Sequence, residues 1–139
     1  MPMYPGGNAE TATDANVRTF ADFIGAKLVR ADEDEVVAEL AIEPHHWNLA
    51  RIVHGGVYMS LLDSAMGLLV SLHYPNRPVV TTNLNIHFTE PASEGTLVCR
   101  AKFIHRARST MTVEGRVYLG TDRLCAHATG SFRVLKLPS

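Results

Sequence analysis

Asp63 is the residue of this sequence whose surroundings most clearly indicate chemistry. It lies inside the apolar run Val57–Leu72, where burying an unpaired carboxylate would cost several kcal/mol. Such an aspartate either pairs with an arginine, or meets water at a subunit contact, or serves as a general base or nucleophile whose pKa is tuned by burial. The periodicity of the run does not distinguish these alternatives.

Two glycines, Gly55 and Gly56, precede Asp63 at the point where a helix should begin. Amides in a first helical turn lack helical acceptors. With the positive end of the helix dipole, they could hold the carbonyl oxygen of an acyl-transfer transition state. Asp63 follows two turns later, roughly 12 Å along the axis. Since that separation is too great for one helix to hold a single reacting carbon at both places, we expect a two-fold related partner to complete the site.

The elements that position these residues follow from the spacing of apolar side chains. A short helix that Asp14 could cap should end at Gly25, and strands are expected at 27–31 and 36–42. A long buried helix at about 55–73 and four further strands follow, within the ranges 83–88, 97–103, 111–117 and 124–134. This order predicts an α+β fold in which an antiparallel β-sheet wraps around a long central helix.

The surface of the long helix suggests close contact with another backbone. Its small residues recur at helical spacing and form a stripe made of Ser60, Ser64, Gly67 and Ser71. Met59 and Met66 lie on the same helix, where filling of the core is a simpler interpretation than lining of a tunnel.

Composition limits the remaining possibilities. The chain has 139 residues, 46% hydrophobic and 19% charged, with a formal net charge of −1. We expect one domain at 13–139 after a flexible N-terminus at 1–12, and neither nucleic acid nor a membrane as partner. The start of the chain lacks the features of a signal peptide. Cys99 and Cys125 form no disulfide framework or C-x-x-C motif, so we expect buried thiols and a cytoplasmic location.

A longer pattern joins these residues to a known family. Asn48, His54, Gly55, Gly56 and Asp63, in the spacing N-x5-H-G-G-x6-D, resemble the signature of the PaaI-type acyl-CoA thioesterases, a branch of the hotdog-fold superfamily. Two further segments resemble the strand after the central helix and the closing strand of that family, at 81–92 and 128–132. The resemblance covers about residues 14 to 135.

The resemblance implies a hotdog fold and hydrolysis of an acyl-CoA to a carboxylic acid and free CoA, with no metal or cofactor. Asp63 would activate water or attack the thioester, and Thr81 would orient the water. The Gly55 amide and the Asn48 side chain would polarise the carbonyl, with Asp63 and Thr81 supplied by the other subunit. His54 would support the loop before the helix or assist departure of the thiolate. The assembly would be a homotetramer built from two dimers.

A CoA substrate carries phosphates, so cations should gather near its nucleotide. Arg100, Lys102, Arg106 and Arg108 lie in one strand and its end. Arg106, Arg108 and Ser109 are the best candidates for nucleotide binding, with Gly56 as a further substrate-binding residue. A solvated strand face with ordinary surface cations is an equally good interpretation of this cluster.

The other histidines do not indicate a metal site. His45 and His46 are adjacent, and neither Cys nor carboxylate completes a ligand set around them. The expected strands carry His87, His105 and His127. Each of these histidines lies alone on its strand and fits a structural role better than a catalytic one.

Two other functions remain open. A protein of the same fold could bind acyl-CoA without hydrolysing it. It could also hydrate or dehydrate enoyl thioesters, although such enzymes generally pair a catalytic histidine with a carboxylate on a differently spaced helix motif, which is not found in this sequence. The sequence does not identify the acyl group.

Overall fold

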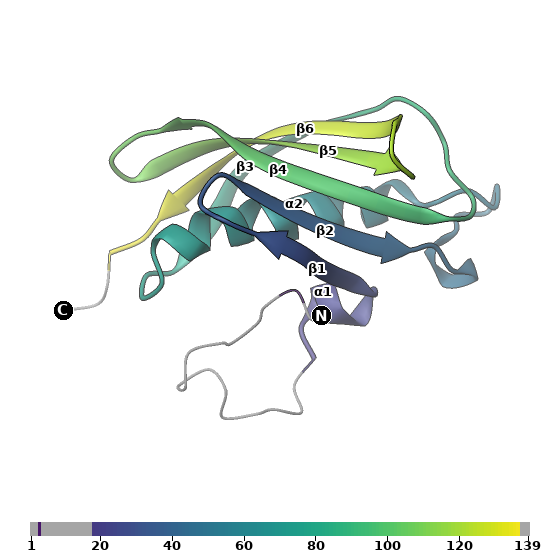
Figure 1. The fold of residues 1–139 in the computed structure, drawn as a ribbon, viewed down its shortest axis with the longest axis horizontal. Coiled ribbons are helices and arrows are strands. Elements are labelled where there is room, and N and C mark those ends of the chain that lie inside the picture. Colours follow the sequence, from purple (N-terminus) through teal and green to yellow (C-terminus); the bar gives the residue numbers. More distant parts are fainter. Residues whose placement is uncertain (1–2, 4–17, 137–139) are drawn as a thin grey trace.

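The elements appear in the expected order. A computed structural model describes Met3 and residues 18–136 (Figure 1). The helices are α1 (Phe20–Phe23), the short 3-10 helix η1 (Pro44–His46) and α2 (Gly55–His73). The strands are β1 (Ala26–Ala31), β2 (Glu35–Ala41), β3 (Val79–Phe88), β4 (Thr96–Arg106), β5 (Thr110–Leu119) and β6 (Arg123–Val134).

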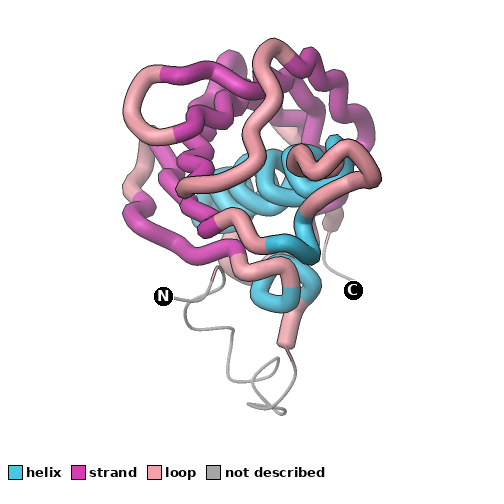
Figure 2. The backbone as a smooth tube through the Cα atoms, turned by 90° about the vertical axis from the view of Figure 1, so that its right-hand side faces the viewer, coloured by secondary structure: helices cyan, strands magenta, loops and turns pink. Residues whose placement is uncertain are grey.

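The six strands form one antiparallel sheet in the order β1-β2-β4-β5-β6-β3. Figure 2 looks along the molecule and shows the sheet curling around α2. Helix α2 lies between β2 and β3 in the chain and connects strands on opposite sides of the sheet. Strand β3 therefore pairs with β6 and forms the edge opposite β1. The expected α+β arrangement is confirmed.

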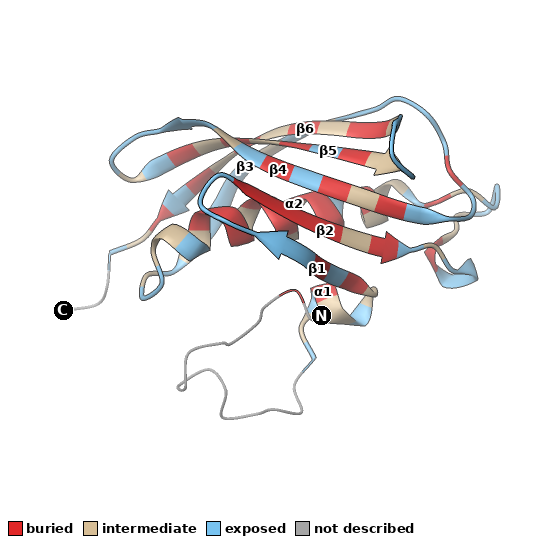
Figure 3. Cartoon of the chain, in the orientation of Figure 1, coloured by how far each residue is buried: buried red, intermediate tan, exposed pale blue. Residues whose placement is uncertain are grey.

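The core lies between α2 and the inner face of the sheet, and buried residues alternate with more exposed ones along β4 and β5 (Figure 3). On α2 the fully buried residues are Leu61, Leu62, Ala65, Met66, Leu69 and Val70. Gly115 of β5 permits the close approach, because a Cβ added there would lie 2.7 Å from Leu62 and 2.9 Å from Met66. Met66 therefore fills the core as expected, and Cys99 and Cys125 are buried free thiols.

The face of α2 turned away from the sheet is only partly covered. Met59 is 48% exposed and Leu72 is 46% exposed, and the stripe of small residues on this helix is half-buried. By length and composition alone α2 is apolar enough to cross a bilayer, but the core helix of a soluble protein meets the same criterion. Its packing against strands β2 to β6 accounts for its apolar composition.

Two expectations about element boundaries are wrong. The first helix begins at Phe20, and Thr19 is its N-cap because the Thr19 hydroxyl accepts the Asp22 N–H. The expected cap, Asp14, lies outside the described residues. Strand β3 begins at Val79, four residues before the expected start. The expected flexible segment 1–12 also lies outside the described residues, except for Met3, which is buried and donates its N–H to Asp22.

Candidate active site

The loop before α2 is held by side chains that link it to distant parts of the chain. His46 is 3% exposed; its Nε2 lies 2.7 Å from the Ile24 carbonyl, and its Nδ1 accepts the Glu43 N–H. Trp47 donates its indole N–H to the Ser93 carbonyl at 2.8 Å. His46 is therefore a structural histidine, and the loop that follows has a fixed position.

Asn48 uses its carboxamide oxygen to shape this loop. Oδ1 accepts the N–H of Ala50 at 2.9 Å and that of Ile52 at 3.4 Å, and Arg51 between them adopts a positive φ of 60°. Because the oxygen is engaged in this turn, the NH2 group of Asn48 remains as a donor. It bonds to no other residue in the described part of the chain.

The start of α2 leaves one backbone donor free. His54 is the N-cap; its Nδ1 accepts the Gly56 N–H at 2.8 Å, and its carbonyl accepts the Val57 N–H at 2.9 Å. Within residues 18–136 the Gly55 N–H has no acceptor. The Gly55 amide is thus a hydrogen-bond donor at the positive end of the helix dipole, whereas the Gly56 amide serves the cap.

Asp63 lies two turns further along, on the partly covered face of α2. The hydroxyl of Thr81 donates to its Oδ1 at 2.6 Å. Asp63 forms no ion pair with a described residue, so pairing with an arginine is excluded there. The carboxylate is held by a neutral donor and lies at a surface that a second chain or a substrate could cover.

A β-bulge explains why Thr81 reaches Asp63. Thr81 is opposite Phe132 and Asn83 is opposite Ser131, so Thr82 is the extra residue in β3. Phe132 faces α2 and is 1% exposed, which places Thr81 on the helix side of the sheet. Simple alternation from Leu84 and Ile86 would have turned Thr81 outward.

Asn48 and Gly55 line one cavity of about 320 Å³, together with Phe88 at the other end of β3. A Cβ on Gly55 would lie 3.3 Å from the Phe88 ring, so this ring packs directly on the glycine. Phe88 and Thr81 are seven residues apart, roughly 23 Å along the strand. One chain therefore carries two separate groups of candidate residues, Asn48 with Gly55 and Asp63 with Thr81.

The expected basic cluster on β4 divides into parts with different surroundings. Arg100 and Lys102 lie 3.3 Å and 3.6 Å from the buried carboxylate of Glu35, which also pairs with Arg30. Arg106 stacks over the Phe103 ring at 4.9 Å. These contacts give three of the expected cations structural partners.

Arg108 and Ser109 instead line a cavity of about 810 Å³ that contains cations unanticipated from the sequence. Its other lining residues include Arg77, Arg133 and Lys136. Arg77 donates to the carbonyls of Val134 and Leu135, and Val134 donates to Ser109, so the wall is well connected. These residues are far apart in sequence, and only the pairing of β6 with β3 and β5 brings them together.

In the described residues, no group of His, Cys, Asp and Glu side chains is arranged to hold a metal.

Comparison with known proteins identifies the family. A family model described as "Thioesterase superfamily" matches residues 50–126, more than half of the chain. The chain belongs to the thioesterase superfamily. The matched range contains the loop from Ala50, the whole of α2 and strands β3 to β5.

Similar solved structures and a curated relative agree with this placement. A conserved protein of Pseudomonas aeruginosa is 29% identical, with 89% of this chain and 99% of that chain covered and a TM-score of 0.80. A mutant of the phenylacetic acid degradation protein PaaI from Thermus thermophilus is 25% identical, with coverage of 84% and 98% and a TM-score of 0.77. Human acyl-coenzyme A thioesterase 13 is 29% identical over 79 residues, 56% of each chain. The expected hotdog fold is confirmed.

Proposed function

We propose that this member of the thioesterase superfamily hydrolyses acyl-CoA thioesters, with Asp63 as the general base or nucleophile. The observation that carries the proposal is the Asp63 carboxylate, which has no cationic partner among the described residues and accepts the Thr81 hydroxyl at 2.6 Å. Superfamily membership supports thioester hydrolysis as the general chemistry. A relative named acyl-coenzyme A thioesterase supports CoA as the carrier.

In the proposed reaction, R–CO–S–CoA and water give R–COOH and CoA–SH. The Gly55 N–H and the Asn48 NH2 group donate to the thioester oxygen and stabilise the negative charge that develops there. Asp63 either takes a proton from the attacking water or attacks the carbonyl carbon itself. Thr81 holds the carboxylate in position, and His54 acts by capping α2 so that the first-turn amides keep their direction.

Two chains are needed to assemble this chemistry. Strand β3 is a ten-residue edge strand whose pairing in the described chain is with β6 alone. Antiparallel pairing with β3 of a second chain, centred between Leu84 and Asn85, would place Thr81 opposite the partner's Phe88 and so beside the partner's Gly55. We propose a dimer with two such sites, and a homotetramer formed from two dimers.

The cavity around Arg108 and Ser109 is the proposed site for the phosphates of CoA. Its guanidinium groups suit phosphate oxygens, which they bind through paired hydrogen bonds. Val134 lines this cavity and pairs with Val79, two residues before Thr81 on β3. The cavity is therefore at the same end of the strand as Asp63, and it would bind the nucleotide while the thioester lies between the subunits. A cytoplasmic location is part of the same proposal.

Replacement of Asp63 by Asn tests the function. The amide keeps the size of the side chain but is neither a base nor a nucleophile, so we expect nearly complete loss of thiol release from a panel of acyl-CoA thioesters. Size-exclusion chromatography should show an unchanged assembly, and equilibrium binding of CoA should persist.

Two outcomes would contradict the assignment. Hydrolysis by Asp63→Asn at the wild-type rate would remove Asp63 from the mechanism. Tight binding of acyl-CoA by the wild-type protein without release of thiol would indicate a binding module instead.

A further inference from the structure

The cavity beside Gly55 has an exposed rim and a buried inner end. At its rim Phe88 is 54% exposed, and Asn48 and Gly55 are half-buried. At its inner end Tyr58 and Val53 are each 4% exposed and Cys125 is fully buried. The cavity therefore leads from the free Gly55 amide toward the core.

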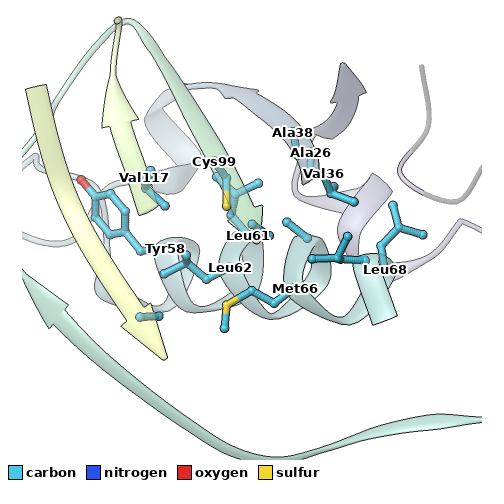
Figure 4. Packing of buried hydrophobic residues seen from close by; sticks show 14 of the residues in the cluster. Ala26, Val36, Ala38, Tyr58, Leu61, Leu62, Met66, Leu68, Cys99 and Val117 are labelled. Carbon is cyan, nitrogen blue, oxygen red and sulfur yellow. The ribbon is translucent and has the colours of Figure 1, made fainter. Parts of the chain in front are cut away.

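Tyr58 closes this inner end. Its ring extends from α2 into the space between helix and sheet, with the hydroxyl at the end farther from the helix (Figure 4). It meets the Phe88 ring edge to face, with centroids 5.9 Å apart and planes at 67°. The buried hydroxyl makes no hydrogen bond in the described structure, and burial raises its pKa to about 12. The ring thus contributes shape to the inner end of the cavity.

We propose that this cavity receives the acyl group of the thioester, and that Tyr58, with Cys125 beside it, forms the floor that limits the length of that group. The inference rests on the proposed function, because it takes the Gly55 N–H as the donor to the thioester carbonyl. The thioester carbonyl would lie at Gly55, and the CoA would extend from it to the cationic cavity of the other chain. The acyl group would then enter the cavity beside Gly55, whose apolar lining includes Ile52, Val53, Tyr58 and Phe88.

The size of the cavity sets the class of acyl group. An apolar cavity of about 150 Å³ holds a benzene molecule, and this one has about 320 Å³. A compact acyl group therefore fits above Tyr58, whereas a long fatty chain would reach the floor and be forced back to the rim. Each methylene accommodated in an apolar pocket should raise kcat/KM roughly fourfold until the floor is reached.

The test is the dependence of kcat/KM on acyl length, measured by thiol release from acetyl-, butyryl-, hexanoyl-, octanoyl-, decanoyl- and palmitoyl-CoA. The wild-type protein should show a rise followed by a sharp fall. Tyr58→Leu should move the fall to longer chains, with a gain of roughly fourfold per newly accommodated methylene. Cys125→Ala, a smaller change at the same inner end, should move it in the same direction and serves if Tyr58→Leu is poorly folded.

Two variants separate shape from other effects. Tyr58→Phe keeps the ring and removes only the hydroxyl, so the length at which kcat/KM falls should not move. Leu62→Ala loosens the core one turn further along α2, where the residue is fully buried but does not line the cavity. It should also leave the length limit in place.

The outcomes distinguish this inference from the proposed function. The wild-type protein, Tyr58→Leu and Cys125→Ala could all hydrolyse the panel with the same length limit. That result would contradict the proposal that Tyr58 and Cys125 limit acyl length, and it would leave the proposed thioesterase activity supported. Equal hydrolysis of acetyl- and palmitoyl-CoA by the wild-type protein would do the same. Absence of hydrolysis of every thioester by the wild-type protein would overturn both.

Discussion

The hydroxyl of Thr81 contacts Asp63 through a single hydrogen bond of 2.6 Å. A hydrogen bond to a charged group contributes roughly 1.5–3 kcal/mol, so Thr81→Val, which keeps the shape of the side chain, should lower kcat roughly ten- to a hundredfold. Thr81→Ser keeps the hydroxyl and should recover most of that loss. Steady-state kinetics with one acyl-CoA measures both, and a Val variant with wild-type kcat would show that the carboxylate is positioned by other contacts.

Two buried groups, the Cys99 thiol and the Tyr58 hydroxyl, predict that the stability of the fold decreases at alkaline pH. Burial raises the pKa of the Cys99 thiol from 9.0 to about 12 and that of Tyr58 from 10.0 to about 12. Between these values the unfolded chain loses protons that the folded chain retains, so folding stability falls as pH rises. Urea titrations should therefore give a free energy of unfolding that declines from about pH 9 upward, relative to its value at about pH 8.

The same experiment has a specific control. Cys99→Ala removes the thiol whose pKa burial raises to about 12, so the decline in its free energy of unfolding between about pH 9 and pH 12 should be shallower than that of the wild-type protein. Parallel curves for the two proteins would show that Cys99 titrates similarly in the folded and unfolded states.

At the scale of elements, the bulge in β3 accommodates Thr82 as an extra residue. Deleting Thr82 removes the extra residue, so Asn83 follows Thr81 directly and regular alternation from Leu84 still places Thr81 on the helix side, opposite Phe132. We therefore expect the deletion variant to keep most of the activity, while circular dichroism shows that the sheet persists. Thr82→Ala keeps the extra residue and should also retain activity. A loss of activity as large as that of Thr81→Val in the folded deletion variant would show that the bulge itself is needed to place Thr81.

At the scale of the whole molecule, the separation of the two residue groups predicts complementation between chains. Asp63→Asn and Asn48→Ala should each be inactive alone. In a dimer containing one of each, one of the two sites has both residues intact. Since half of a random mixture consists of such dimers, co-expression should recover about a quarter of the wild-type activity. No recovery in isolated mixed dimers would place both groups in a site formed by one chain.

Local interactions made part of this molecule predictable from its sequence. The bounds of α2, the free Gly55 amide in its first turn and the burial of Met66 follow from the apolar spacing and from the two glycines at the start of the helix. These features depend on residues a few positions apart. The boundaries of the smaller elements were less accurate, because the cap at Thr19 and the early start of β3 depend on packing against other elements.

The sequence by itself determined the long helix, the order of the strands and the candidate residues for the proposed chemistry, because periodicity and helix-terminal chemistry act over one or two turns. Only the tertiary structure decided which of those residues meet. The Thr82 bulge brings Thr81 to Asp63, sheet pairing brings Arg77 and Arg133 to Arg108, and Tyr58 closes a cavity whose wall includes Phe88. Each of these contacts joins segments whose register is set by the whole sheet, and no local pattern specifies that register.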